Sequence, residues 1–96
     1  MKKLDEVIRI LKELEPELTE KYKVKSLAVF GSYARNQQGE NSDLDILVEF
    51  SRPVGFEFFR AQRFIEEKLG LKVDLVTRDA IKPGIEKNVL RDLARV

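Results

Sequence analysis

The chain has 96 residues, of which 43% are hydrophobic and 36% charged, and 18 Lys and Arg balance 17 Asp and Glu to leave a net charge of +1. This composition is typical of one folded domain, spanning residues 1–96, with no overall charge to attract nucleic acid or membrane. The sequence holds neither cysteine nor histidine, which excludes disulfides, thiol catalysis, Ser-His triads and the usual zinc ligands. Any metal would therefore have oxygen ligands, which favours Mg²⁺ or Mn²⁺.

Membrane and nucleic-acid partners are not expected from the sequence. No apolar run approaches the length that spans a bilayer, and no signal peptide precedes the first expected helix, so we expect a cytoplasmic protein. No long basic stretch is present either, and a nucleic-acid partner would lack its usual electrostatic footprint.

The first half of the chain predicts a helix, a strand and a loop. Apolar residues recur at helical spacing at Leu4, Val7, Ile8, Leu11 and Leu14. We expect Pro16 to end this helix or to open another short turn through Leu18. Residues 24–30 predict a strand, which should be covered on both faces because it is largely apolar, and residues 36–42 predict a polar loop.

The second half predicts two more strands and two more helices. Alternation from Asp43 to Phe50 predicts a strand, and residues 71–77 predict another. In the first of these strands, one side would carry Leu44, Ile46 and Val48, and the other Asp43, Asp45 and Leu47. Between the two strands, a helix should end at Gly70. The residues that mark this helix by their spacing are Phe58, Gln62, Ile65 and Leu69. Pro83 should open a last helix, whose apolar stripe would be Ile85, Val89 and Leu93. This order predicts an α/β fold, with a small mixed sheet of about three strands covered by helices.

Three carboxylates stand on the expected strands. Asp43 and Asp45, two residues apart, would face the same side with their backbones roughly 7 Å apart. Carboxylates that close repel each other unless a cation or proton intervenes, and a divalent metal suits them. Asp74 lies amid apolar residues of the last strand and could join them on one sheet face. Taken singly, the pair is more often a solvated strand edge, and Asp74 is as consistent with a surface ion pair.

Gly31 and Ser32 follow the first expected strand directly and precede a helical turn. A glycine lets the backbone approach a phosphate closely, and free backbone N–H groups at a helix start favour anions. On its own, this pair is more often an ordinary capping serine after a turn glycine.

The spacing of these residues resembles a known family. Gly31 and Ser32, ten intervening residues, then Asp43-Leu44-Asp45, with Asp74 later, give the text GSYARNQQGENSDLD and a third acidic strand position. This pattern resembles that of the DNA polymerase β-like nucleotidyltransferase superfamily, and GSYAR followed by SDLDILV is similar to its minimal nucleotidyltransferase branch. The resemblance runs from about Val24 to Thr77 and implies the nucleotidyltransferase fold.

The resemblance implies roles for the matching residues. Asp43, Asp45 and Asp74 would be the catalytic carboxylates and would hold two Mg²⁺ ions, for which Mn²⁺ could substitute. Gly31 and Ser32 would hold the phosphates of ATP. Arg35, one helical turn from Gly31, is a further candidate for a phosphate contact, although a solvated arginine is an equal alternative.

Two departures from the family pattern matter. Relatives often have Gly after this arginine, where Asn36 stands, which leaves the shape of the loop open. Relatives also often have another strand after the last helix. Because the sequence ends at Val96, we do not expect a fourth strand.

The implied function is transfer of AMP from ATP to a hydroxyl on a partner protein, because relatives of this size resemble antitoxins that modify a tyrosine of HEPN toxins. One alternative is a binding module that neutralises its partner by contact, with little or no catalysis. Another is a transferase acting on a small molecule, for which we expect a chain of this length to lack a second pocket. Four phenylalanines could serve the core or, if exposed, a partner or homo-oligomer surface: Phe56, Phe58, Phe59 and Phe64.

Overall fold

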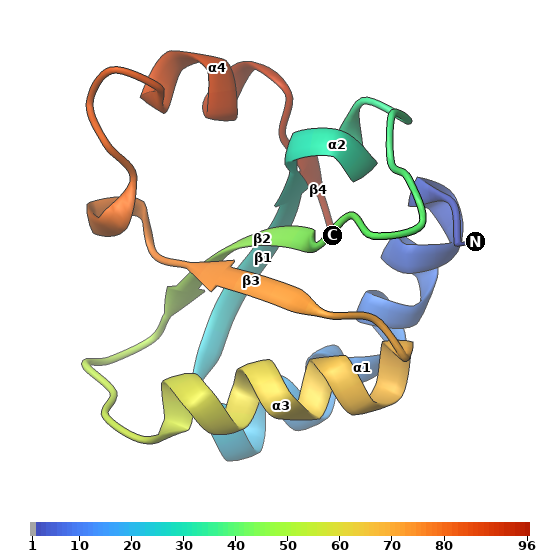
Figure 1. Ribbon diagram of the computed structural model, residues 1–96. Coiled ribbons are helices and arrows are strands. Elements are labelled where there is room, and N and C mark those ends of the chain that lie inside the picture. The colour runs from blue at the N-terminus through green and yellow to red at the C-terminus, as the bar shows by residue number, and fades with distance from the viewer. Residues whose placement is uncertain (1) are drawn as a thin grey trace.

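The computed structural model describes residues 2–96, which form a four-stranded sheet with helices on both sides (Figure 1). Two long helices, α1 (Leu4–Tyr22) and α3 (Glu57–Leu69), cover one face of the sheet. The strands are β1 (Val24–Phe30), β2 (Leu44–Phe50), β3 (Val73–Val76) and β4 (Ala94–Arg95). The shorter helical segments of these residues are α2 (Gly31–Ala34), the 3₁₀ helix η1 (Arg78–Ala80) and α4 (Glu86–Arg91).

The sheet is mixed, as the sequence predicted, but it has four strands instead of about three. Its order is β3-β2-β1-β4, with β1 antiparallel to both neighbours and β2 parallel to β3. The parallel pair is joined by α3, as parallel strands require. The additional strand, β4, pairs Ala94 with Val29 and Arg95 with Ala28. Two residues are too few to show an alternating pattern, so the expectation of no fourth strand was wrong.

The hydrophobic core lies between the sheet and the two long helices. Alternate residues of β2 point into it, and Leu44, Ile46 and Val48 are at most 2% exposed. The facing helices contribute side chains at the predicted helical spacing, namely Val7, Leu11, Leu18, Ala61, Phe64, Ile65 and Leu69. Burial of a Leu or Ile side chain of this kind contributes about 1.5–3 kcal/mol to stability.

The opposite face of the sheet is only partly covered. Along β1, Ala28 is buried, whereas Lys25 and Ser26 are exposed. The prediction of a strand covered on both faces was therefore wrong for the first half of β1. A run of apolar residues reveals that a strand is buried but not which face is left open.

Both proline-based helix boundaries differ from expectation. α1 continues through the exposed Pro16, because Leu11 and Leu18 on either side of it are fully buried and hold the helix across the lost hydrogen bond. At the other end of the chain, α4 begins only at Glu86, and Ile85 is 51% exposed. Among residues 2–96, no helix has the length and apolar composition needed to cross a bilayer.

Candidate active site

The first element of the site is the junction between β1 and α2, where Gly31 has a positive φ of 73°. A side chain there would also have no space, because a Cβ built on Gly31 would overlap Oδ2 of Asp45 and lie 3.1 Å from its Cγ. Conformation and space thus both require glycine. The consequence is that the carboxylate of Asp45 lies directly against the backbone at the start of α2.

The short helix α2 is held in place by a buried aromatic side chain. Its Tyr33 is 1% exposed and belongs to the core, which fixes a helix of only four residues. Ser32 is partly buried, and its carbonyl oxygen accepts a hydrogen bond of 2.8 Å from the Gln37 N–H. Gly31 and Ser32 therefore lie at the C-terminal end of β1, on a short helix that core packing holds in place.

The carboxylates of β2 and β3 lie next to each other across the sheet. Asp45 and Asp74 are register partners in the parallel β2–β3 pair. Their chain neighbours Leu44, Ile46 and Val73 are buried toward the helices, so the two aspartates project from the opposite face. The structure thus brings together Asp45, Asp74 and Gly31, which are far apart in the sequence.

Asp43 is not gathered as closely. It precedes the first residue of β2, at the end of the polar loop, and is exposed. Within residues 2–96, no group of three or more acidic side chains lies close enough together to hold a metal ion. Because sheet pairing begins only at Leu44, nothing in the sheet fixes the position of Asp43.

Electrostatics nevertheless mark this cluster. The pKa of the Asp45 carboxyl is raised from 3.8 to about 6, chiefly by partial burial and then by the charges of Asp74 and Asp43, with Arg35 acting in the opposite direction. Within residues 2–96, none of the three aspartates forms an ion pair. Hard oxygen donors with uncompensated negative charge fit a divalent cation such as Mg²⁺, provided that Asp43 moves closer.

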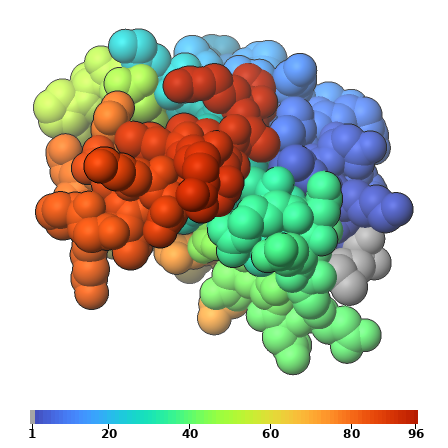
Figure 2. Space-filling model, turned by 90° about the horizontal axis from the view of Figure 1, so that it is seen from above, coloured from blue at the N-terminus to red at the C-terminus, as the bar shows by residue number. Residues whose placement is uncertain are grey.

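The side chain of Arg35 contacts two other polar side chains and is not simply surrounded by solvent. Its guanidinium lies 3.7 Å from the Asp92 carboxylate and donates a 3.2 Å hydrogen bond from Nε to Gln37. This ion pair links the segment after α2 to the segment after α4. Figure 2 shows the two segments side by side, the green one with α2 next to the orange and red C-terminal one.

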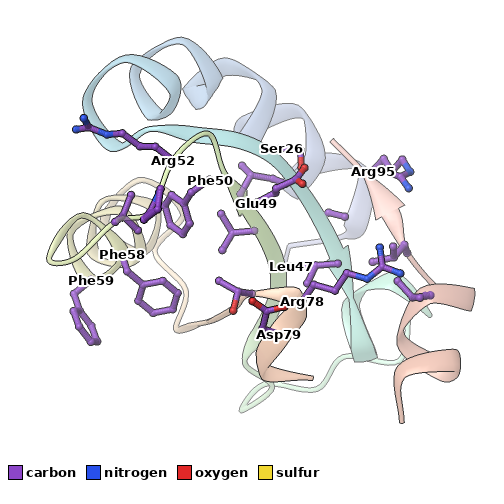
Figure 3. Close-up of a pocket in the computed structure, with 18 residues that line it drawn as sticks. Ser26, Leu47, Glu49, Phe50, Arg52, Phe58, Phe59, Arg78, Asp79 and Arg95 are labelled. Carbon is purple, nitrogen blue, oxygen red and sulfur yellow. The ribbon is translucent and has the colours of Figure 1, made fainter. Parts of the chain in front are cut away.

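A groove of about 820 Å³ is lined in part by Leu47 of β2 (Figure 3). Leu47 is on the same side of β2 as Asp45, so the groove lies on the sheet face that carries this carboxylate. Its floor includes Ser26 and Ala28 of β1 and Leu47 and Glu49 of β2, of which Leu47 is two residues from Asp45. Its walls come from the start of α3, from η1, and from the end of α4 with the segment after it. The wall residues include Phe58, Phe59, Arg78, Asp79, Leu90, Leu93 and Arg95.

Sequence reasoning missed this groove. Alternation showed that Leu47 would point away from the core side of β2, but no pattern showed that the face would stay open. The expectation that the chain would lack a second pocket was therefore wrong. The four phenylalanines divide between the two alternatives, because Phe64 is buried at 9% exposure whereas Phe56 and Phe59 are 78% and 66% exposed.

Comparison with known proteins identifies the family. The sequence model of the family described as nucleotidyltransferase domain matches residues 11–96. MJ0128 of Methanocaldococcus jannaschii, which bears the provisional name of protein adenylyltransferase, is 51% identical over 98 residues and the alignment covers both chains fully. The protein adenylyltransferase MntA of Thermococcus cleftensis is 43% identical over 94 residues, covering 97% of this chain and 95% of the relative.

Solved structures agree. A structure provisionally described as a minimal nucleotidyltransferase superposes with a TM-score of 0.76 at 30% identity, covering 99% of this chain and 95% of the other. A complex of a tri-AMPylated HEPN toxin with its MNT antitoxin, from Shewanella oneidensis, shares the fold alone, with a TM-score of 0.57 at 19% identity over 96% of this chain and 66% of the other. The chain therefore belongs to the nucleotidyltransferase domain family, in its minimal branch, as its sequence pattern predicted. It is an enzyme that transfers a nucleotidyl group.

Proposed function

We propose that this enzyme transfers AMP from ATP to a hydroxyl on a partner protein, and that the partner is a HEPN-type toxin which the modification silences. The observation that carries the proposal is the pair of neighbouring carboxylates, Asp45 and Asp74, set against the side-chain-free backbone at Gly31. The names of the relatives support transfer of adenylyl groups to protein, and the AMPylated toxin in the Shewanella complex supports the class of partner. The reaction would take place in the cytoplasm.

In this proposal, the residues of the site divide the work. Asp45 and Asp74, joined by Asp43, would hold two Mg²⁺ ions, for which Mn²⁺ can substitute. Bound metal would neutralise triphosphate charge and lower the pKa of the acceptor hydroxyl. Gly31 would let the phosphates approach the backbone, and the Ser32 hydroxyl would donate a hydrogen bond to them.

The transfer step is a substitution at the α-phosphorus of ATP. The acceptor oxygen would form the new bond to phosphorus while the bond to the pyrophosphate oxygen breaks. Asp74 would receive the hydroxyl proton, because it is the exposed carboxylate of the neighbouring pair. Arg35 would contact the departing phosphates, which requires it to leave Asp92.

The groove beside the carboxylates favours a protein as the acceptor. It lies on the sheet face that carries Asp45, it is open to solvent, and aromatic side chains such as Phe58 and Phe59 line it (Figure 3). A polypeptide segment could lie there with its hydroxyl directed toward the carboxylates, Tyr being favoured by the family resemblance. The exposed Phe56 and Phe59 would also suit contact with the partner or with a second copy of the chain.

One observation favours the binding-module alternative. The three aspartates are not gathered as a metal site within residues 2–96, and Arg35 is engaged with Asp92. A chain that kept this arrangement with ATP present would bind a partner without modifying it. The two functions differ in whether the partner gains mass.

The test is to incubate the enzyme with the HEPN-type protein encoded beside it, ATP and Mg²⁺, and to weigh the partner by intact mass spectrometry. We expect one or more additions of AMP with the wild type and none with Asp45→Asn. Glu67→Gln, which changes an exposed carboxylate on α3, is the matched control and should modify the partner normally. A partner that is bound and inhibited but keeps its mass would favour the binding module.

A further inference from the structure

The strand β3, which carries Asp74, is held from its outer side by two side chains of α3. β3 is an edge strand with β2 as its neighbour in the sheet. The Val73 N–H donates a 2.9 Å hydrogen bond to Oε2 of Glu66, and the Val73 carbonyl accepts a 2.9 Å hydrogen bond from Nε2 of Gln62. Both backbone groups of the residue before Asp74 are thus bound by α3.

The direction of the backbone groups in β3 explains why side chains, and not another strand, bind Val73. The Leu44 N–H donates to the carbonyl of Lys72 at 2.9 Å, so that carbonyl faces β2. The N–H and carbonyl of Val73 therefore point away from the sheet, where an edge strand has no neighbouring strand to bind them. Gln62 and Glu66 are one helical turn apart and provide a donor and an acceptor in the order that Val73 requires. Both are partly buried, which limits competition from water.

We propose that Gln62 and Glu66 are positioning residues for Asp74. A four-residue edge strand paired on one side could shift or fray, and its carboxylate would shift with it. By fixing Val73 from the outer side, the two side chains keep Asp74 in register with Asp45. The inference rests on the proposed function, in which Asp74 helps to hold the metal.

The test measures binding of Mn²⁺ together with a non-hydrolysable ATP analogue, by electron paramagnetic resonance, and needs no acceptor. Gln62→Leu and Glu66→Leu should each weaken Mn²⁺ binding about 10-fold, the scale seen when a residue that orients a metal ligand is lost. Glu66→Gln keeps an acceptor oxygen for the Val73 N–H and should bind Mn²⁺ within about twofold of the wild type. Gln62→Glu places an acceptor against a carbonyl and should be as weak as Gln62→Leu.

Two further variants make the outcome decisive. Ser51→Ala removes a side-chain hydrogen bond to the Lys23 carbonyl, near the end of β2 remote from Asp45, and should leave Mn²⁺ binding unchanged. Asp74→Asn should reduce Mn²⁺ binding more than either leucine variant. Normal Mn²⁺ binding by Gln62→Leu and Glu66→Leu, with loss in Asp74→Asn, would overturn the positioning role alone. Normal binding by Asp74→Asn would instead overturn the metal site of the proposed function, and the positioning role with it.

Discussion

The two faces of the sheet differ in burial and in charge. On the helix-covered face, Leu44, Ile46 and Val48 of β2 are nearly inaccessible to water. On the other face, the intervening residues meet charge, solvent and an open groove, and Asp45 has a raised pKa because its surroundings disfavour the ionised form. The buried side chains of β2 therefore stabilise the fold, whereas the carboxylate on its other side lowers the stability.

This contrast separates what folds the chain from what makes it an enzyme. Carboxylates that repel one another and a groove without a covering helix do not help a small domain to fold. The fold tolerates them because packing on the helix-covered face contributes enough stability to offset their cost. Substitutions on the two faces should consequently change the free energy of unfolding in opposite directions.

The largest expected effect is on the covered face. Ile46→Ala leaves a cavity beside fully buried neighbours and should lower the free energy of unfolding by about 3 kcal/mol. Denaturant titration measures the change. A loss below about 1 kcal/mol would mean that the core does not depend on this face of β2.

The next effect is at the junction between β1 and α2. Gly31→Ala meets both an unfavourable φ and the Asp45 carboxylate, and should lower the free energy of unfolding by at least about 2 kcal/mol. Gly70→Ala has a similar φ of 67° but open space, so it should lose only about 1 kcal/mol. Equal losses in the two variants would show that the contact with Asp45 does not matter.

On the open face, the sign reverses. Asp45→Asn relieves repulsion with Asp74 and Asp43, and should raise the stability of the metal-free protein by about 1 kcal/mol after allowance for solvent screening. The same change should abolish nucleotidyl transfer. Thermal melts with a chelator measure the gain, and Glu67→Gln, on the exposed side of α3, should leave the melting temperature unaltered. A stability loss in Asp45→Asn would contradict the repulsion.

The smallest effect is a dependence on pH. Because the pKa of Asp45 is raised from 3.8 to about 6 on folding, its favourable contribution is fully present below pH 3.8 and is lost as the pH rises through 6. The stability of the metal-free wild type, measured relative to Asp45→Asn, should fall by about 1 kcal/mol or less between pH 4 and pH 7.5. Chemical denaturation of both proteins across this range provides the measurement. A constant difference would contradict the raised pKa.

The sequence predicted the covered face well and the open face poorly. Helical and alternating patterns reveal burial, so α1, α3 and the inward residues of β2 followed directly. The spacing from Gly31 to Asp45, together with Asp74, also predicted that these three residues would meet across the sheet, whereas the expected convergence of Asp43 with them is not seen. Each of these inferences used local periodicity or a fixed spacing.

What could not be predicted depends on relations without a local pattern. The groove is made by residues from four parts of the chain, and β4 forms only because β1 offers a free edge to Ala94 and Arg95. The passage of α1 through Pro16 is decided by packing on either side of that residue. The place of Asp43 outside the paired strand follows from where the β2–β3 register begins, which composition does not fix.

The pairing of β4 with β1 also bears on the order in which the molecule folds. Most of the sequence lies between Val29 and Ala94, so closing this contact restricts far more chain than joining β1 to β2. We therefore expect the segment from η1 to β4 to dock last and to open first in native-state hydrogen exchange. This late-docking segment forms one wall of the groove. A bound partner could therefore reshape that wall without disturbing the core on which the enzyme depends.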